Sequence, residues 1–194
     1  MREFKTKEIL SRHIEPEKLG LYLTEVEKAN EKFSLFSRNL QRGDLEALVA
    51  DCLVADELGL IGETPGRVVD IGSGWGLPAI PLLLATNKID ITLVERSQKK
   101  ADFLALLLHK LSLSAHVHAG DIQTLPEDAK FDVIISRRVA LEKKLISQIR
   151  RHANPGATII YYGTAFPHDV FESAKVVEYS LDNSDVRTII KSDF

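Results

Sequence analysis

The stretch Val68-Val69-Asp70-Ile71-Gly72-Ser73-Gly74-Trp75-Gly76 decides the fold of this chain. A short run of mainly apolar residues predicts a buried strand, and three glycines at alternating positions follow it directly. Glycine adopts positive φ without strain and lets the backbone approach a ligand closely. A helix beginning just after the loop would point its amide groups toward that ligand. The stretch therefore predicts a strand, a ligand-binding loop and a helix.

The residues after this loop alternate between strand and helix patterns. Five strands with helices between them are expected, the strands at 67–71, 89–95, 115–119, 131–136 and 158–162 and the helices at 77–85, 97–111 and 141–152. Two more β segments, 175–181 and 186–191, flank Asp182-Asn183-Ser184, which is typical of a hairpin turn. Such alternation predicts an α/β fold with a doubly wound, mostly parallel, seven-stranded sheet covered on both faces. Ligands of these sheets bind at the carboxyl ends of the strands.

The first sixty residues are expected to be helical. Pro16 suits the first turn of a helix, and apolar residues recur at three- and four-residue spacing from Leu19 to Phe33. Asp44 is expected to cap a second helix that ends near Gly59. We therefore predict an N-terminal helical extension over 1–62, packed on an α/β domain over 63–194.

Composition and charge bound the function. The chain has 194 residues, 44% hydrophobic and 27% charged, which suits one globular domain. The net charge of −3 is not the basic balance common in nucleic-acid-binding domains, although a local basic patch remains compatible with it. The segment Met1–Leu10 carries charges throughout and does not resemble a signal peptide, and no apolar run is long enough to span a bilayer. We expect a cytoplasmic protein without disulfides, because Cys52 is the single cysteine.

Two cofactors compete for the glycine loop. A dinucleotide-binding fingerprint needs glycine at its first, third and sixth positions, but the sixth position from Gly72 is Leu77. The glycines at 72, 74 and 76, with Asp70 before them, resemble the first motif of class I methyltransferases. In those enzymes a carboxylate and the loop backbone hold the methionine part of S-adenosylmethionine. A purely structural turn is the alternative interpretation.

Two further acids favour S-adenosylmethionine. Glu95 ends the second strand, where a carboxylate can accept hydrogen bonds from a ribose diol. Asp121 follows the third strand, where class I methyltransferases commonly contact the adenine amino group. A surface Glu–Arg pair and an ordinary turn are the respective alternatives. The cofactor-binding residues expected from this resemblance are Asp70, Gly72, Ser73, Gly74, Gly76, Leu77, Glu95, Arg96, Asp121, Ile122 and Arg137.

Residues 68–163 resemble a particular family, the bacterial 16S ribosomal RNA guanine-N7 methyltransferases, long called glucose-inhibited division protein B. Three stretches carry the resemblance: 70–81, with its Leu-Pro-Ala-Ile-Pro run; 95–104, with an acid, a basic pair and Phe-Leu; and 131–140, with Phe-Asp, an apolar run and Ser-Arg. The Leu-Pro-x-Ile-Pro run is far more specific than the glycines. The resemblance implies transfer of a methyl group to a guanine N7.

Four departures lie on the expected substrate side. Ala29-Asn30 and the segment 34–37 match the family's N-terminal helix only partly. The family's His-x-x-Asp-Ser motif lacks its histidine near Val49-Ala50-Asp51-Cys52. Arg138 replaces a small residue, and Tyr162 stands where the family has a lysine. The cofactor motifs are intact, so these departures concern the acceptor.

The expected chemistry needs little acid–base catalysis. Guanine N7 carries a lone pair and no proton, so methyl transfer needs alignment and exclusion of water. Arg137, at the end of the fourth strand, is the expected catalytic residue, placed to position a phosphate or the guanine O6 edge. A buried salt bridge to an acid on the cofactor side is its alternative role. A basic footprint for RNA is expected from Arg96, Lys99, Lys100, Arg137, Arg138, Lys143 and Lys144, with Arg150, Arg151 and His152 further out.

The sequence thus predicts a monomeric methyltransferase whose partner is ribosomal RNA or the small ribosomal subunit. No metal is expected, because the six histidines show no ligand spacing. A methyltransferase of the same fold with a small-molecule or protein acceptor remains open, as does a non-catalytic relative that binds cofactor or RNA. An NAD-dependent oxidoreductase is disfavoured by Leu77 in the fingerprint.

Overall fold

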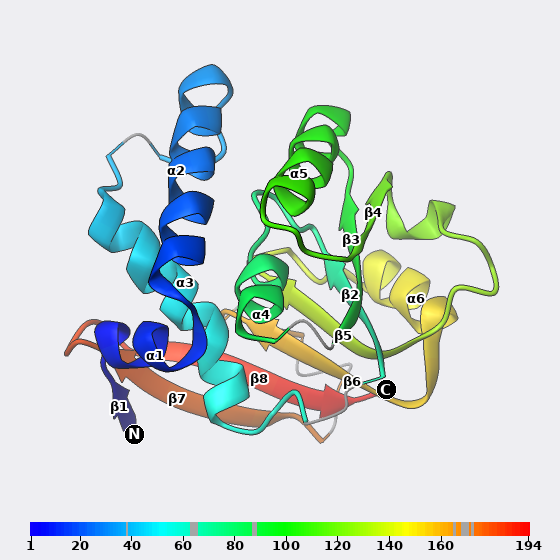
Figure 1. The fold of residues 1–194 in the computed structure, drawn as a ribbon. Coiled ribbons are helices and arrows are strands. Elements are labelled where there is room, and N and C mark those ends of the chain that lie inside the picture. The colour runs from blue at the N-terminus through cyan, green and yellow to red at the C-terminus, as the bar shows by residue number, and fades with distance from the viewer. Residues whose placement is uncertain (38, 63–65, 87–88, 165, 168–170, 172) are drawn as a thin grey trace.

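The computed structural model describes residues 1–37, 39–62, 66–86, 89–164, 166–167, 171 and 173–194. A sheet of eight strands, in the order β1-β7-β8-β6-β5-β2-β3-β4, forms its centre (Figure 1). The strands are β1 (Arg2–Phe4), β2 (Arg67–Ile71), β3 (Asp90–Glu95), β4 (His116–Ala119), β5 (Phe131–Arg137), β6 (Ala153–Tyr162), β7 (Lys175–Leu181) and β8 (Arg187–Asp193). The helices are α1 (Thr6–His13), α2 (Pro16–Lys32), α3 (Arg42–Glu57), α4 (Ala79–Ala85), α5 (Gln98–Lys110), α6 (Lys143–His152) and the short 3₁₀ helix η1 (Ile122–Thr124).

Strand β2 lies at the switch point of the sheet. It pairs in parallel with β3 on one side and with β5 on the other, so that Asp70 lies between Leu93 and Ile135. Because β3 leads outward to β4 while β5 leads to β6, the chain winds away from β2 in both directions. The doubly wound α/β fold predicted from the sequence is confirmed.

The C-terminal hairpin is also confirmed, but the strand count is not. Strand β8 runs antiparallel to both β6 and β7, and Asp182 and Asn183 turn the chain with positive φ angles. All seven expected strands are present in the described part of the chain. An eighth, β1, pairs in parallel with β7. The expectation of an entirely helical N-terminal segment is therefore wrong at Arg2–Phe4.

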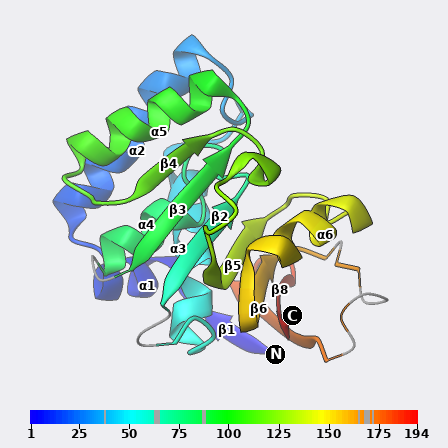
Figure 2. The same ribbon diagram turned by 90° about the vertical axis from the view of Figure 1, so that its right-hand side faces the viewer.

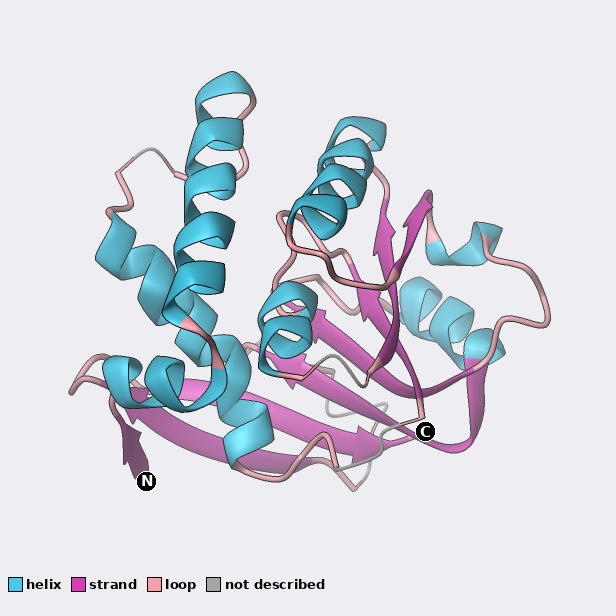
Figure 3. Cartoon of the chain, in the orientation of Figure 1, coloured by secondary structure: helices cyan, strands magenta, loops and turns pink. Residues whose placement is uncertain are grey.

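Helices cover both faces of the sheet, as Figure 2 and Figure 3 show, with α6 on the opposite side from α2, α3 and α5. The alternation of side chains along each strand produces this division. In β2, Val68 packs with the N-terminal helices, α4 and α5, whereas Val69 packs with α6 and η1. The first cluster is the larger one and joins α1, α2 and α3 to the sheet without interruption.

Several element ends differ from the prediction for local reasons. Helix α4 begins at Ala79 rather than residue 77, because Pro78 occupies the N-cap position. Helix α3 is capped by Gln41, and Asp44 accepts the Gln41 backbone N–H from the third helical position, so Asp44 is not the cap. The expected division of the chain at residues 62–63 stays a prediction, since 63–65 lie outside the described residues.

Candidate functional site

The carboxyl ends of β2, β3, β4 and β5 meet at one edge of the sheet, because these strands are parallel neighbours. The glycine loop after β2 is anchored to the adjacent strand. Gly72 and Ser73 donate their backbone N–H groups to the Val94 carbonyl at 2.9 and 3.2 Å. Gly120, after β4, donates to the Glu95 carbonyl at 2.9 Å. The ends of β2, β3 and β4, where the sequence predicts cofactor-binding residues, are thus held side by side.

A cavity of about 520 Å³ opens at this edge. That volume is within the range of small-molecule sites. Six of the predicted cofactor-binding residues line it: Gly72, Gly74, Glu95, Arg96, Asp121 and Ile122. The rest of its wall includes Ile71, Val94, Lys100, Gln123, Val139, Ala140, Glu142, Lys144, Leu145 and Gln148. The sequence therefore located the cavity but missed the wall built by the segment after β5 and by α6.

Glu95 connects the loop to the cavity. Its carboxylate accepts the backbone N–H of Gly74 at 2.9 Å through Oε2 and that of Ser97 at 2.9 Å through Oε1. The side chain is 8% exposed. A carboxylate offers about four lone-pair positions, so two acceptor positions remain for a ligand. Glu95 thus fixes the glycine loop and retains capacity to accept hydrogen bonds.

Two glycines form a cradle that side chains would fill. A Cβ atom built on Gly72, at φ +75°, would lie 2.6 Å from Cγ2 of Val139 on the opposite wall. A Cβ on Gly74, at φ +59°, would meet only the Gly72 carbonyl oxygen, at 3.8 Å, and would project into open space. The loop therefore presents bare backbone to the cavity, as a ligand held by main-chain groups requires.

The far end of the cavity is built by η1 and α6. Asp121 precedes η1, and its Oδ1 accepts the Gln123 backbone N–H at 3.2 Å. Gln148 of α6 donates from Nε2 to Oε1 of Gln123 at 2.7 Å. The paired amides tie η1 to α6 across the cavity wall. No motif pointed to Gln123 or Gln148, because the pairing depends on how α6 packs against η1.

Four of the predicted cofactor-binding residues lie behind the loop instead of lining the cavity. Asp70 is fully buried, and its carboxylate oxygens have no hydrogen-bond partner among the described residues. Burial raises the pKa of Asp70 to about 8; the nearby Ser73 hydroxyl and Ala79 backbone N–H oppose this shift, and the charge of Glu95 adds to it. Ser73 donates its hydroxyl to the Asp70 carbonyl, Leu77 is 5% exposed, and a Cβ on Gly76 would lie 2.3 Å from Cγ1 of Ile80. These four residues pack beneath the loop, on the side away from the cavity, and support its conformation.

Trp75 in the loop has a packing role. Its ring stacks on Tyr22 of α2, with centroids 6.1 Å apart and planes 19° apart, and it contacts Phe36 at 5.3 Å. The Tyr22 hydroxyl donates to the Trp75 carbonyl at 3.3 Å. The loop is thereby fixed to the N-terminal helices.

Arg137 lies beside a second cavity, of about 340 Å³, and does not line the first. The expectation that it contacts the cofactor is therefore not met by the geometry of the described residues. Its Nη2 forms a salt bridge with Oδ2 of Asp51 at 2.9 Å. The buried salt bridge considered as an alternative is present, although the acid comes from helix α3 and not from the cofactor side.

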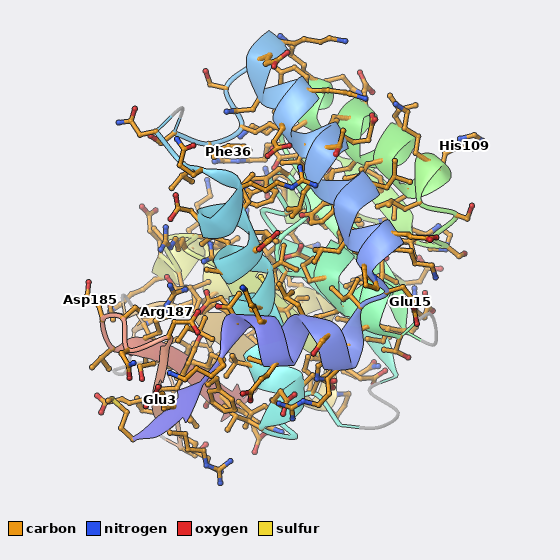
Figure 4. The ribbon with its side chains drawn as sticks, turned by 60° about the vertical axis from the view of Figure 1, so that its left-hand side comes forward. Glu3, Glu15, Phe36, His109, Asp185 and Arg187 are labelled. Atoms are coloured by element: carbon orange, nitrogen blue, oxygen red, sulfur yellow. The ribbon has the colours of Figure 1, made fainter. Side chains whose placement is uncertain are left out.

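Asp51 is the centre of a buried network that the sequence did not reveal. Its Oδ1 accepts from Nη1 of Arg187 at 3.0 Å and from the Tyr179 hydroxyl at 2.6 Å. Figure 4 shows Arg187 near the start of the C-terminal strand, beside helix α3. The neighbouring Tyr162 donates its hydroxyl to the Cys52 carbonyl at 2.8 Å. Helix α3, strand β5 and the hairpin therefore converge on a single carboxylate.

The predicted basic footprint is only partly present. Arg96, Lys100 and Lys144 line the first cavity, and Arg137 and Arg138 line the second. His152 is 3% exposed, and its Nδ1 lies 2.8 Å from the Ala129 carbonyl, so its place in the footprint is wrong. Among the described residues, no three His, Cys, Asp or Glu side chains are grouped as metal ligands would be. No helix in the described ranges has the length and apolar character needed to cross a membrane.

Comparison with known proteins places the chain in a family. The family model described as "GidB: rRNA small subunit methyltransferase G" matches residues 15–191. The proteins named Ribosomal RNA small subunit methyltransferase G from Streptococcus suis (strain 05ZYH33) and Syntrophus aciditrophicus (strain SB) are 29% and 31% identical to it, over 68% and 69% of this chain. The chain spans about 62% and 60% of the length of these two relatives.

Solved structures share the fold. The Thermus thermophilus 16S rRNA N2 G1207 methyltransferase (RsmC), in complex with AdoMet and guanosine, superposes with a TM-score of 0.57 at 18% identity, over 81% of this chain and 44% of that one. A methyltransferase from Pyrococcus furiosus gives 0.55 at 16% identity, over 72% and 81%. With the family model matching almost the entire chain, this protein belongs to the GidB family of rRNA small subunit methyltransferase G proteins.

Proposed function

We propose that this chain is an S-adenosylmethionine-dependent methyltransferase that methylates the N7 of a guanine in 16S ribosomal RNA of the small ribosomal subunit. The cavity at the ends of β2, β3 and β4 is the observation that carries the proposal, because bare glycine backbone, Glu95 and Asp121 converge there. Family membership supports the RNA substrate. Such an enzyme acts where ribosomes are, in the cytoplasm, and we propose that it acts as a monomer.

Each part of the cavity wall suits a different part of the cofactor: the ribose, the adenine or the methionine. Glu95 would accept hydrogen bonds from the ribose diol, and Asp121 would accept one from the adenine amino group. The backbone at Gly72 and Gly74 would lie along the methionine part, where side chains would obstruct it. When bound, S-adenosylmethionine supplies an electrophilic methyl group on a sulfonium.

The protein's task at the acceptor is positioning. Guanine N7 has an available lone pair and no proton to lose, so no general base is required. The residues between the two cavities, Arg137 to Ala140, can hold the base in line with the methyl group and exclude water. Tyr161 stabilises this segment by donating its hydroxyl to the Val139 carbonyl at 3.1 Å.

Glu95→Ala is expected to weaken S-adenosylmethionine binding about 10- to 100-fold, or about 1.4–2.8 kcal/mol. The variant loses the ribose acceptor and also releases Gly74 and Ser97. Isothermal titration calorimetry measures the change. Asp102→Ala is the control, because this exposed acid on α5 bonds Gln98 and does not line the cavity. Unchanged affinity in the Glu95 variant would contradict the assignment of this cavity.

Transfer of a labelled methyl group tests the function itself. The acceptors are 16S rRNA, free and in small subunits, from cells that lack guanine-N7 methylation. Label that maps to a guanine N7 would support the proposal. Cofactor binding without incorporation into either acceptor would refute the RNA substrate, and small molecules or proteins would then be tested.

A further inference from the structure

The second cavity carries an excess of positive charge. Asp51 is the single acid among its described lining residues, whereas Arg137, Arg138 and Arg187 all contribute guanidinium groups. Asp51 pairs with two of them, whereas Arg138 is exposed and has no ion-pair partner among the described residues. Three guanidinium charges therefore face a single carboxylate charge. This excess of positive charge makes the cavity complementary to an anion.

Arg137 has a hydrogen-bond donor that no described residue satisfies. Its side chain is 10% exposed, and its Nε is buried without a hydrogen-bond partner in the described part of the chain. Arg138 adds backbone strain, because its φ of +57° is unusual for a residue with a side chain. Unsatisfied donors and strained backbone gather at functional sites more often than elsewhere.

The position of this cavity relative to the first indicates its ligand. Arg137 and Arg138 line the second cavity, and the next two residues, Val139 and Ala140, line the first. A nucleotide whose base reached the first cavity from this side would therefore bring its flanking phosphate among the arginines. Guanidinium groups bind phosphate with charge-assisted hydrogen bonds, often two at a time.

We propose that Arg137 and Arg187 form a clamp for a backbone phosphate of the acceptor RNA, and that Asp51 is the positioning residue that aligns both arginines. This inference rests on the proposed function and assigns the site that holds its RNA. Asp51 Oδ2 holds Arg137 from β5, while Oδ1 holds Arg187 from β8. Tyr179 donates to the same Oδ1 and keeps the carboxylate oriented.

Binding of unmethylated 16S rRNA at several salt concentrations tests the clamp, with S-adenosylhomocysteine present to prevent turnover. Arg187→Gln is expected to weaken RNA binding about 10-fold near physiological salt and to reduce the slope of log affinity against log salt by about one phosphate contact. Affinity for S-adenosylmethionine is expected to stay unchanged. Arg12→Gln is the control, since Arg12 is equally charged, exposed, and paired with Glu57 away from both cavities.

Asp51→Asn tests the positioning role separately. The amide keeps the shape and can accept from Tyr179, but it no longer attracts both arginines, so RNA affinity is expected to fall while cofactor affinity is retained. Unchanged RNA affinity and salt slope in Arg187→Gln would overturn the clamp. So would full displacement of RNA by millimolar inorganic phosphate, which would indicate a free-anion site. These experiments measure RNA binding and not methyl transfer. If the wild-type protein binds RNA without methylating it, the proposed function is refuted while the clamp is still supported.

Discussion

Asp51→Ala is expected to lower the free energy of unfolding by about 3–5 kcal/mol. The substitution removes the shared partner of Arg137 and Arg187 and of the Tyr179 hydroxyl. Removing one partner of a buried ion pair costs more than replacing both partners with apolar residues, because an uncompensated charge stays buried. Arg137 will account for most of the loss, since its side chain is 10% exposed whereas that of Arg187 is 27% exposed and better hydrated.

Urea unfolding of matched variants isolates the charge effect. Tyr179→Phe removes one hydrogen bond to the same carboxylate and leaves the charges paired, so it is expected to cost only about 1 kcal/mol. Burial, with the nearby Asp51 charge as a smaller cause, raises the pKa of Tyr179, which therefore remains a donor over the accessible pH range. Adding Arg137→Met to Asp51→Ala should recover part of the loss. Equal losses in Asp51→Ala and Tyr179→Phe would contradict a buried charge network.

The cavity at the ends of β2, β3 and β4 was predictable because it depends on short-range sequence features and a simple topology. A glycine-rich loop after an apolar strand fixes where a ligand meets the backbone. Parallel strands then bring their carboxyl ends to one edge, so Glu95 and Asp121 could be assigned to the same cavity without knowledge of side-chain packing.

The second cavity and the network around Asp51 were not predictable from these features. Asp51 and Arg137 are 86 residues apart, and their contact depends on how α3 lies across the sheet. Helix α3 is buried almost all round through residues 49–55, so its periodicity did not single out Asp51 as a functional side chain. Strand β1 is three residues long and mostly exposed, so it shows no alternation; its pairing with β7 is a tertiary effect.

The free energy of unfolding of Asp70→Asn is expected to rise relative to that of the wild type as pH rises from about 5 to 8. Burial raises the pKa of Asp70 from 3.8 to about 8, so the folded state keeps a proton that the unfolded state releases. Folded protein thus binds more protons than unfolded protein between these values, and wild-type stability falls with pH by up to about 1.4 kcal/mol per unit. Below the unfolded-state pKa this destabilisation is absent.

The asparagine variant has no proton to lose at this position, so its contribution is independent of pH. Any constant cost of burying the amide cancels when the difference from the wild type is compared at pH 5 and pH 8.

Asp132→Asn is the control, because the pKa of Asp132 is shifted in the opposite direction. Hydrogen bonds from the Arg67 backbone and Asn154 lower the pKa of Asp132, so its stabilisation is lost only as pH falls below the unfolded value. Its difference from the wild type should therefore stay constant over the same range. Parallel profiles of wild type and Asp70→Asn would mean that Asp70 is ionised in the folded protein. The nearby Ser73 hydroxyl and Ala79 backbone N–H, which favour the charged form of the carboxyl, would then outweigh the effect of burial.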